Sequence, residues 1–101
     1  MKLEKNEYYI VINDDGRVLT GVKEPNVSAS RIYVRSFDIS KDYKEIYIDK
    51  QFNHKSIFYL RMFKRLSTAN EYKDTLNEHR GGGWEVYIYN QETKEVFEIE
   101  E

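Results

Sequence analysis

Asp14 and Asp15 are the residues whose type and spacing come closest to a catalytic pair, and Asp38 and Asp42 could form another. Paired carboxylates can divide general acid and general base work when their surroundings push their pKa values apart. Asp14 and Asp15, however, directly precede Gly16, and aspartate is favoured in such turns because it hydrogen-bonds the local backbone. We therefore expect these carboxylates to support a turn rather than to perform catalysis.

The other residue types that carry chemistry lack the spacing that metal binding or nucleophilic catalysis needs. His54 and His79 are the only histidines, whereas zinc requires three or four converging ligands. The absence of cysteine excludes disulfides and thiolate chemistry. No serine lies in a nucleophile-elbow pattern. The sequence thus predicts a non-enzymatic protein with no catalytic residue, no metal site and no cofactor.

Residues 81–83 are three consecutive glycines, a composition found in loops that cradle phosphates. Such loops precede a helix, so that its N-terminal N–H groups can face the anion. Here the glycines follow a segment with helical periodicity. Glycine accepts the left-handed conformation that commonly ends a helix, so we interpret these residues as a helix end.

The charge of the chain is segregated. Residues 31–66 carry nine basic and four acidic side chains, whereas residues 67–101 carry three basic and nine acidic ones. The formal net charge of the whole chain is only −2, and opposite patches cancel at long range. Only a local patch could therefore attract a charged partner.

The acidic end combines carboxylates with tyrosines on one expected hairpin. Carboxylates can occupy a surface built for phosphates, and exposed tyrosines serve as anchors at protein interfaces. The alternative is a solvated sheet edge whose charges deter aggregation. The candidate protein-binding residues are Glu85, Tyr87, Tyr89, Glu92, Glu95, Glu98 and Glu100.

The basic middle of the chain interleaves arginines with aromatic residues. Bases stack on aromatic rings and arginines pair with phosphates, so this pattern suits single-stranded nucleic acid. Alternatively, the tyrosines pack in the core while arginine stems cover apolar surface. The candidate nucleic-acid-binding residues are Arg31, Tyr33, Arg35, Tyr59, Arg61 and Arg65.

The elements that position these residues begin with an N-terminal hairpin. Residues 8–12 and 17–20 have strand composition, and the Asp-Gly step between them supplies the positive φ angles of a tight turn. Residues 32–35 are predicted to form a third strand. Residues 45–49 are predicted to form a fourth, although Ser40 could instead cap a short helix there.

Residues 57–66 fit both the helical and the strand period. The strand is favoured, because Thr68 and Glu71 form a capping box that begins a separate helix. This amphipathic helix is predicted over residues 69–80. The residues at its apolar spacing are Ala69, Tyr72, Leu76 and His79.

A C-terminal hairpin follows the glycines. Residues 84–89 alternate, with Trp84, Val86 and Ile88 on one face, and residues 95–100 return after a turn. The sequence therefore predicts a single α+β globular domain over residues 1–101. Its largely antiparallel sheet should contain about five to seven strands, with one well-defined amphipathic helix.

We expect a non-enzymatic protein-binding inhibitor that occludes a host nucleic-acid-binding protein through the acidic aromatic hairpin. In size, cysteine-free composition and lack of motifs, the chain resembles the small accessory proteins of bacteriophages, including anti-CRISPR proteins. The first alternative is a small RNA or single-stranded-DNA binding protein that uses the basic aromatic face. The second is a structural homodimeric accessory protein.

The expected environment is the cytoplasm, without a membrane partner. The N-terminus is polar, and no stretch of the sequence approaches the length of a membrane span. The absence of cysteine suits a reducing compartment. Both a monomer and a homodimer agree with the sequence.

Overall fold

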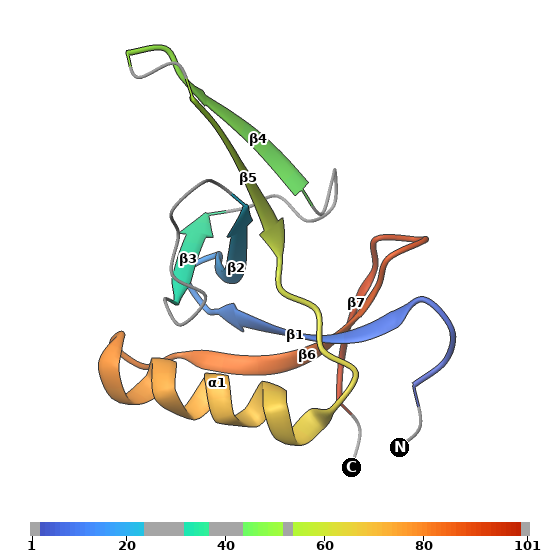
Figure 1. Cartoon of the computed structure of the whole chain (residues 1–101). Helices are drawn as coiled ribbons and strands as arrows, with labels where there is room; N and C mark the ends of the chain where they lie inside the picture. The colour runs from blue at the N-terminus through green and yellow to red at the C-terminus, as the bar shows by residue number, and fades with distance from the viewer. Residues whose placement is uncertain (1–2, 24–31, 37–43, 52–53, 100–101) are drawn as a thin grey trace.

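The computed structural model describes residues 3–23, 32–36, 44–51 and 54–99, which contain one helix and seven strands (Figure 1). The fold is α+β with an antiparallel sheet and a C-terminal hairpin, which confirms the predicted fold class. In chain order the elements are β1 (Glu7–Asn13), β2 (Arg17–Lys23), β3 (Tyr33–Ser36), β4 (Lys44–Asp49), β5 (His54–Leu60), α1 (Leu66–His79), β6 (Trp84–Asn90) and β7 (Val96–Glu98).

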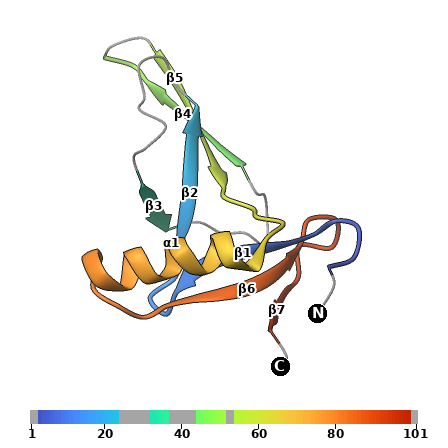
Figure 2. The same ribbon diagram turned by 60° about the horizontal axis from the view of Figure 1, so that its bottom comes forward.

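The strands form one seven-stranded sheet. Six of them follow the order β4-β5-β2-β1-β6-β7, and the seventh, β3, pairs with β2. β1 and β6 pair over their whole length, from Glu7↔Asn90 to Asn13↔Trp84, and α1 lies along this pair (Figures 1 and 2). The β4–β5 hairpin projects away from that layer. The molecule is therefore elongated, with principal extents of 48 × 31 × 23 Å.

The turn of the N-terminal hairpin forms where the sequence predicts it. Gly16 has a φ of 91° and donates its N–H to the carbonyl oxygen of Asn13 at 3.1 Å. The expectation that the Asp-Gly step as a whole takes positive φ is wrong, since Asp15 does not. Three residues link the strands, as in hairpins in which a left-handed glycine follows a type I turn.

The chain after β5 joins β2 to β1 at the point where these two strands separate. Arg61 donates its N–H to the carbonyl oxygen of Leu19 in β2 at 3.1 Å. Phe63 then exchanges backbone hydrogen bonds of 2.7 and 2.9 Å with Tyr9 in β1. Segment 60–63 thereby bends the sheet, because it connects two strands that diverge from their common turn.

Residues 57–66, which fit both periods in the sequence, divide between two elements. β5 runs to Leu60, so the favoured strand is confirmed for the first part of the segment. The isolated bridge through Phe63 follows, and α1 begins at Leu66.

The predicted capping box of Thr68 and Glu71 is wrong, because α1 begins at Leu66 rather than at residue 69. Arg65 is the N-cap residue, in an extended conformation and without a side-chain cap hydrogen bond. Its carbonyl oxygen accepts the first helical bond, from the Ala69 N–H at 3.2 Å. The bridge to β1 fixes the chain just before Arg65, so the helix starts as soon as the chain leaves the sheet.

At the end of α1, the predicted role of the glycines is confirmed, whereas the predicted place of His79 in the apolar stripe is wrong. Residues 81–83 have φ angles of 90°, 78° and 84°, which L side chains rarely adopt, so these glycines end the helix as predicted. His79 is exposed rather than part of the apolar stripe. The stripe buries Ala69 and Leu76, with Tyr72 half-buried.

Two apolar clusters form the core, one on each face of the sheet. The first lies between the sheet and α1 and is centred on Trp84 and Leu76. The second contains Ile10, Val18, Leu60 and Tyr89, none more than 2% exposed. These four residues come from four different strands. Because the sheet is bent, strands β1, β2, β5 and β6 surround the second cluster on one face of the sheet and bury it.

Candidate functional site

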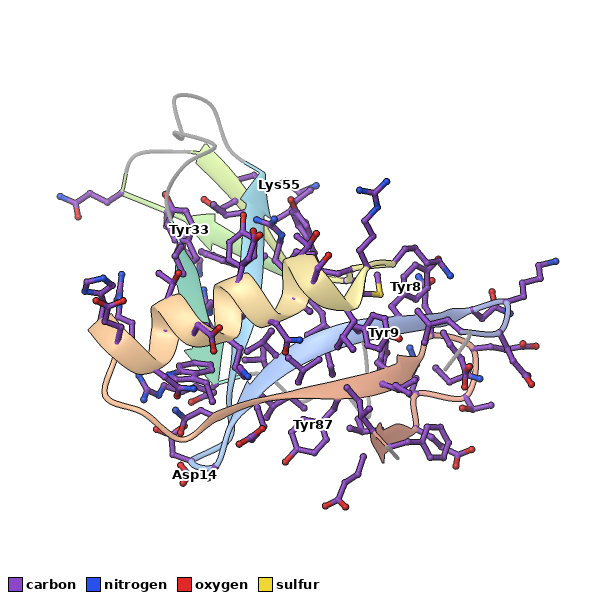
Figure 3. All side chains as sticks on the ribbon, turned by 90° about the horizontal axis from the view of Figure 1, so that it is seen from below. Tyr8, Tyr9, Asp14, Tyr33, Lys55 and Tyr87 are labelled. Atoms are coloured by element: carbon purple, nitrogen blue, oxygen red, sulfur yellow. The ribbon has the colours of Figure 1, made fainter. Side chains whose placement is uncertain are left out.

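Alternation along β6 separates the two faces of the C-terminal hairpin. Trp84, Val86 and Ile88 share one face, as the sequence predicts. This face packs against α1, and the three residues are 1%, 9% and 2% exposed. Glu85 and Tyr87 consequently point to the opposite face. Figure 3 shows the Tyr87 side chain on the side of β6 away from α1.

Three candidate protein-binding residues gather on this outer face: Glu85, Tyr87 and Glu98, here called the acidic hairpin face. The register of β6 and β7 places Glu98 directly opposite Tyr87. Both glutamates are exposed, whereas Tyr87 is half-buried because it packs against the second core cluster. An aromatic ring held by the core and flanked by two carboxylates is a rigid surface feature that suits a cationic partner group.

Tyr89 does not belong to the acidic hairpin face, although the sequence groups it with Tyr87. Its side chain is fully buried beside Ile10, Val18 and Leu60. The alternation of β6 is as predicted, but the bent sheet closes over the Tyr89 end of the strand. Its role is therefore in core packing.

The remaining acidic candidates lie at the turn of the hairpin or outside the described residues. Glu92 is exposed and accepts a hydrogen bond from the Asn6 side-chain amide at 3.0 Å. Glu95 is exposed beside the turn, where its carbonyl oxygen accepts the Asn90 N–H at 2.9 Å. Glu100 lies outside the described residues. Negative charge thus continues from the acidic hairpin face to the turn.

A groove of about 360 Å³ between α1 and β6 is a feature that the sequence does not reveal. Its helix wall consists of Leu66, Asn70 and Lys73, which recur at helical spacing. The other wall is formed by residues 85–87 and the end of β7. With a helix predicted to start at residue 69, Leu66 lies outside the helix, so the stripe that it forms with Asn70 and Lys73 could not be recognised from the sequence.

The sheet register separates the candidate nucleic-acid-binding residues onto opposite faces. Tyr33 shares a face with Leu60, because both pair with Thr20 of β2. Arg35, two residues after Tyr33, points the same way. Tyr59 is adjacent to Leu60 and therefore points to the opposite face. The two strands therefore do not bring Tyr33 and Tyr59 together on one face.

Two arginines of this set make contacts within the fold. The Arg35 guanidinium lies 4.0 Å from the centre of the Phe58 ring. The Arg61 guanidinium lies 5.0 Å from the centre of the Tyr72 ring and donates to its hydroxyl at 3.2 Å. These contacts indicate that the two arginines pack within the fold through cation–π stacking, rather than bind nucleic acid.

The other two arginines of the set are Arg65 and Arg31. Arg65 is exposed at the N-cap of α1. Arg31 lies outside the described residues.

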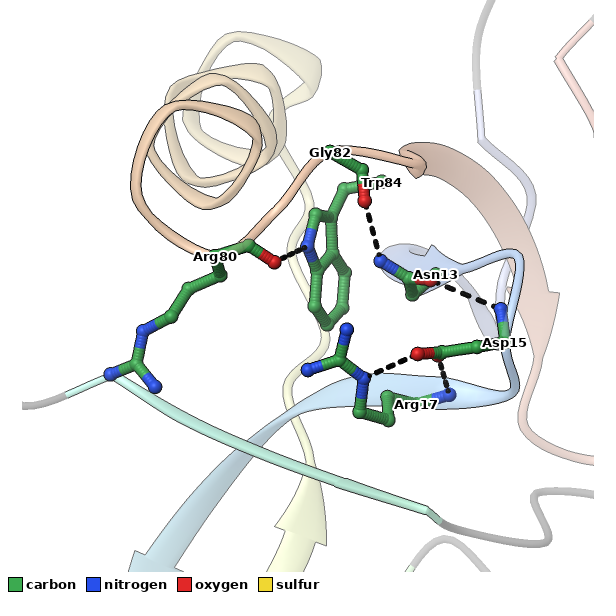
Figure 4. A network of polar contacts seen from close by, with 6 residues as sticks. All are labelled: Asn13, Asp15, Arg17, Arg80, Gly82 and Trp84. Carbon is green, nitrogen blue, oxygen red and sulfur yellow. Dashed lines mark hydrogen bonds and ion pairs between the residues drawn. The ribbon is translucent and has the colours of Figure 1, made fainter.

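The N-terminal turn forms a polar network beside Trp84 (Figure 4). The Asp15 carboxylate accepts the Arg17 backbone N–H at 3.0 Å and its Nε–H at 2.7 Å. The backbone bond above all, with the guanidinium, holds the pKa of Asp15 below its ordinary value. The guanidinium also lies 5.3 Å from the centre of the Trp84 ring. A carboxylate that stays ionised in this way supports the turn and makes a poor general acid.

The described residues offer no clustered group of three histidine or carboxylate side chains that could hold a metal ion. Asp38 and Asp42 lie outside them, as does the side chain of His54. In the same part of the chain, no helix combines the length and the apolar character that crossing a bilayer requires. Comparison of the chain with protein-family models, curated proteins and solved structures found no match.

Proposed function

We propose that this chain is a non-enzymatic protein-binding domain that engages a basic surface of its partner through the acidic hairpin face. The main support is the pairing of Tyr87 with Glu98, beside Glu85 on the same face. Tyrosine supplies contact area at a low cost in conformational entropy, and carboxylates complement arginine and lysine. The charge around this face is also negative, since residues 67–101 carry nine acidic and three basic side chains.

A surface that normally binds nucleic acid is the partner surface that this face complements best. Such surfaces present arginines and lysines at positions that phosphates occupy. The carboxylates of Glu85 and Glu98 would pair with these cations and exclude the nucleic acid. The proposed mechanism is thus inhibition by occlusion, in keeping with the resemblance to small bacteriophage accessory proteins, including anti-CRISPR proteins. The net charge of −2 limits any mimicry of nucleic acid to this local patch.

Three immobilised forms of the protein test the proposal against lysate of the organism that carries the gene. They are the wild type, Glu85→Lys with Glu98→Lys, and a control with Glu71→Lys and Glu78→Lys on the exposed side of α1. The last two have the same net charge. We expect the wild type and the control to retain the same basic protein, and the hairpin variant to lose it.

The captured protein is then tested for nucleic-acid binding in the presence of the wild-type chain. Loss of its nucleic-acid complex supports inhibition by occlusion. The same protein partners on all three forms would contradict the proposal. Direct retention of single-stranded probes by the wild-type chain at low salt would favour the basic residues instead.

A further inference from the structure

Tyr87 has a carboxylate on each of two sides, on the face of β6 that points away from α1 (Figure 3). Glu98 of β7 lies directly across from it. Glu85 comes two residues earlier on β6 and therefore points to the same face. On the other side of Tyr87 lies Ile10 of β1, a fully buried residue of the core cluster that Tyr87 packs against. The core thus supports the ring, and one carboxylate flanks it across the sheet while the other flanks it along the strand.

The spacing of the sheet lets one group reach both carboxylates. Residues directly opposite each other on neighbouring strands have Cβ atoms about 4.5–5.5 Å apart, and diagonal neighbours are about 7–8 Å apart. Glu98 is opposite Tyr87, so Glu85 and Glu98 are diagonal neighbours. Within the described part of the chain, neither glutamate forms an ion pair. A planar cation over the Tyr87 ring can therefore contact a carboxylate on each side.

The fold itself holds a guanidinium between an aromatic ring and a carboxylate. Arg17 lies 5.3 Å from the centre of the Trp84 ring, and its Nε–H donates to the Asp15 carboxylate at 2.7 Å. The lysine that lies over a ring is bound differently. The Lys64 ammonium is 4.1 Å from the centre of the Tyr8 ring and donates to a backbone carbonyl oxygen. The acidic hairpin face presents the two kinds of group, ring and carboxylate, that the fold uses for arginine.

We infer that the acidic hairpin face binds an arginine side chain of the partner protein, stacked on Tyr87 and hydrogen-bonded to Glu85 and Glu98. This inference rests on the proposed function, because it names the partner group that this face recognises. A guanidinium is planar and carries five N–H donors along its edges, so it can stack on a ring while it bonds two carboxylates. A lysine ammonium is a compact point charge without this shape. The face is therefore selective for arginine over lysine.

An arginine held in this way is withdrawn from nucleic acid. Arginine bonds phosphates in bidentate fashion, and it also pairs with O6 and N7 of guanine. Both contacts use the N–H edges that Glu85 and Glu98 would occupy. The inference thereby gives inhibition by occlusion a defined target, a single arginine that the partner needs for its nucleic acid.

Amide NMR of the isotope-labelled full chain at low salt tests the inference with defined probes. These are the acetylated, amidated peptides Gly-Arg-Gly and Gly-Lys-Gly, with Gly-citrulline-Gly as the uncharged control. We expect saturable shifts at Glu85, Tyr87 and Glu98, and an affinity for the arginine peptide at least about threefold above that for the lysine peptide. The citrulline peptide should cause no shifts. Equal affinity for arginine and lysine, or shifts only at other amides, would overturn the inference.

A methylated probe tests the hydrogen bonds to the glutamates separately from the charge. Asymmetric dimethylarginine keeps its positive charge, but methylation blocks bidentate hydrogen bonding. The peptide that carries it in place of arginine should bind about threefold more weakly, as loss of one exposed charged contact implies. Equal affinity of the methylated and unmethylated peptides would contradict bonding of the guanidinium edges by Glu85 and Glu98.

Two variants of Tyr87 test the stacking. Tyr87→Leu removes the ring but keeps an apolar side chain over the core, so the arginine and lysine peptides should then bind equally. Tyr87→Phe keeps the ring and should keep the preference for arginine, since either ring can stack on a guanidinium. Melting curves check that both variants fold. An undiminished preference for arginine in Tyr87→Leu would show that the ring is not part of the site.

Two glutamine variants with the same charge change locate the carboxylates. Glu98→Gln should weaken the arginine peptide about threefold. Glu71→Gln, on the exposed side of α1, is its matched control and should leave the affinity unchanged. Equal effects of the two variants would mean that only the overall charge attracts the peptide, which rejects the inference.

Partner capture separates this inference from the proposed function. Loss of the captured partner by Glu85→Lys with Glu98→Lys, together with equal affinity for the arginine and lysine peptides, leaves the proposed function intact and rejects the selectivity for arginine. Arginine-selective peptide binding with unchanged partner capture supports the arginine site and rejects the proposed function instead.

Discussion

The side-chain amide of Asn77 pairs with the backbone of Trp84 in the manner of a neighbouring strand, through bonds of 3.1 and 2.9 Å. This pairing ties the last turn of α1 to the first residue of β6 across the glycines at 81–83. It fixes the helix along the strand and thereby sets the width of the groove. The acidic hairpin face begins one residue later, at Glu85.

Asn77→Ala should lower the free energy of unfolding by about 2 kcal/mol, because it leaves the N–H and C=O of a buried residue without their partner. Denaturant melts of the variant and of Asn70→Ala, a matched change on the groove wall, measure the effect. Asn70→Ala should stay within about 0.5 kcal/mol of the wild type. Equal stability of the two variants would show that the Asn77 pairing contributes nothing.

Arg65→Ser should raise the free energy of unfolding by about 1 kcal/mol, since it supplies the missing cap oxygen at the start of α1. Thr68→Ala should be nearly neutral, because Thr68 lies inside the first turn and alanine favours helix. Thermal melts compare the two. A clear loss of stability in Thr68→Ala would restore the helix start that the capping box predicts.

Gly21→Ala should destabilise the fold by about 1 kcal/mol, because the added Cβ would overlap the ring of Tyr59 directly across from it. In a Tyr59→Ala background the same change should be neutral or stabilising, since alanine then replaces glycine without a clash. A double-mutant cycle measures this coupling. An additive result would mean that the ring does not cover Gly21.

The Asp15 carboxyl should titrate below its ordinary pKa of 3.8, since the Arg17 backbone N–H and guanidinium favour the ionised form. Stability from a lowered pKa is present above the unfolded value and is lost as pH falls through the folded value. In Arg17→Met the pKa should rise only partway, because the backbone bond remains. NMR titration of the carboxyl gives both values, and complete restoration in Arg17→Met would contradict the leading role of the backbone bond.

The two faces of β6 could be predicted because alternation is a local property of a strand. The burial of Tyr89 could not, because it depends on the bend that segment 60–63 imposes where it bonds Leu19 and Tyr9. The start of α1 could not be predicted for the same reason, since it also depends on the contact of this segment with β1. Thr68 and Glu71 have the residue types of a cap, but the bridge at Phe63 fixes the chain one turn earlier.

The separation of Tyr33 from Tyr59 shows a further limit of sequence reasoning. Each strand reveals its own alternation, but the face that each side chain occupies depends on the register with β2. A shift of one residue would exchange the faces. The segregation of charge, by contrast, is visible in the sequence and persists in the exposed glutamates of the acidic hairpin face.

Calorimetric titration of the purified partner measures directly whether the acidic hairpin face is the binding surface. Glu85→Lys with Glu98→Lys should raise the Kd at least about a hundredfold, and Tyr87→Ala should raise it about thirtyfold, as loss of about 2 kcal/mol implies. The control Glu71→Lys with Glu78→Lys should stay within about twofold of the wild type, because screening limits the effect of distant charges. Equal Kd values for all four proteins would show that the partner binds elsewhere.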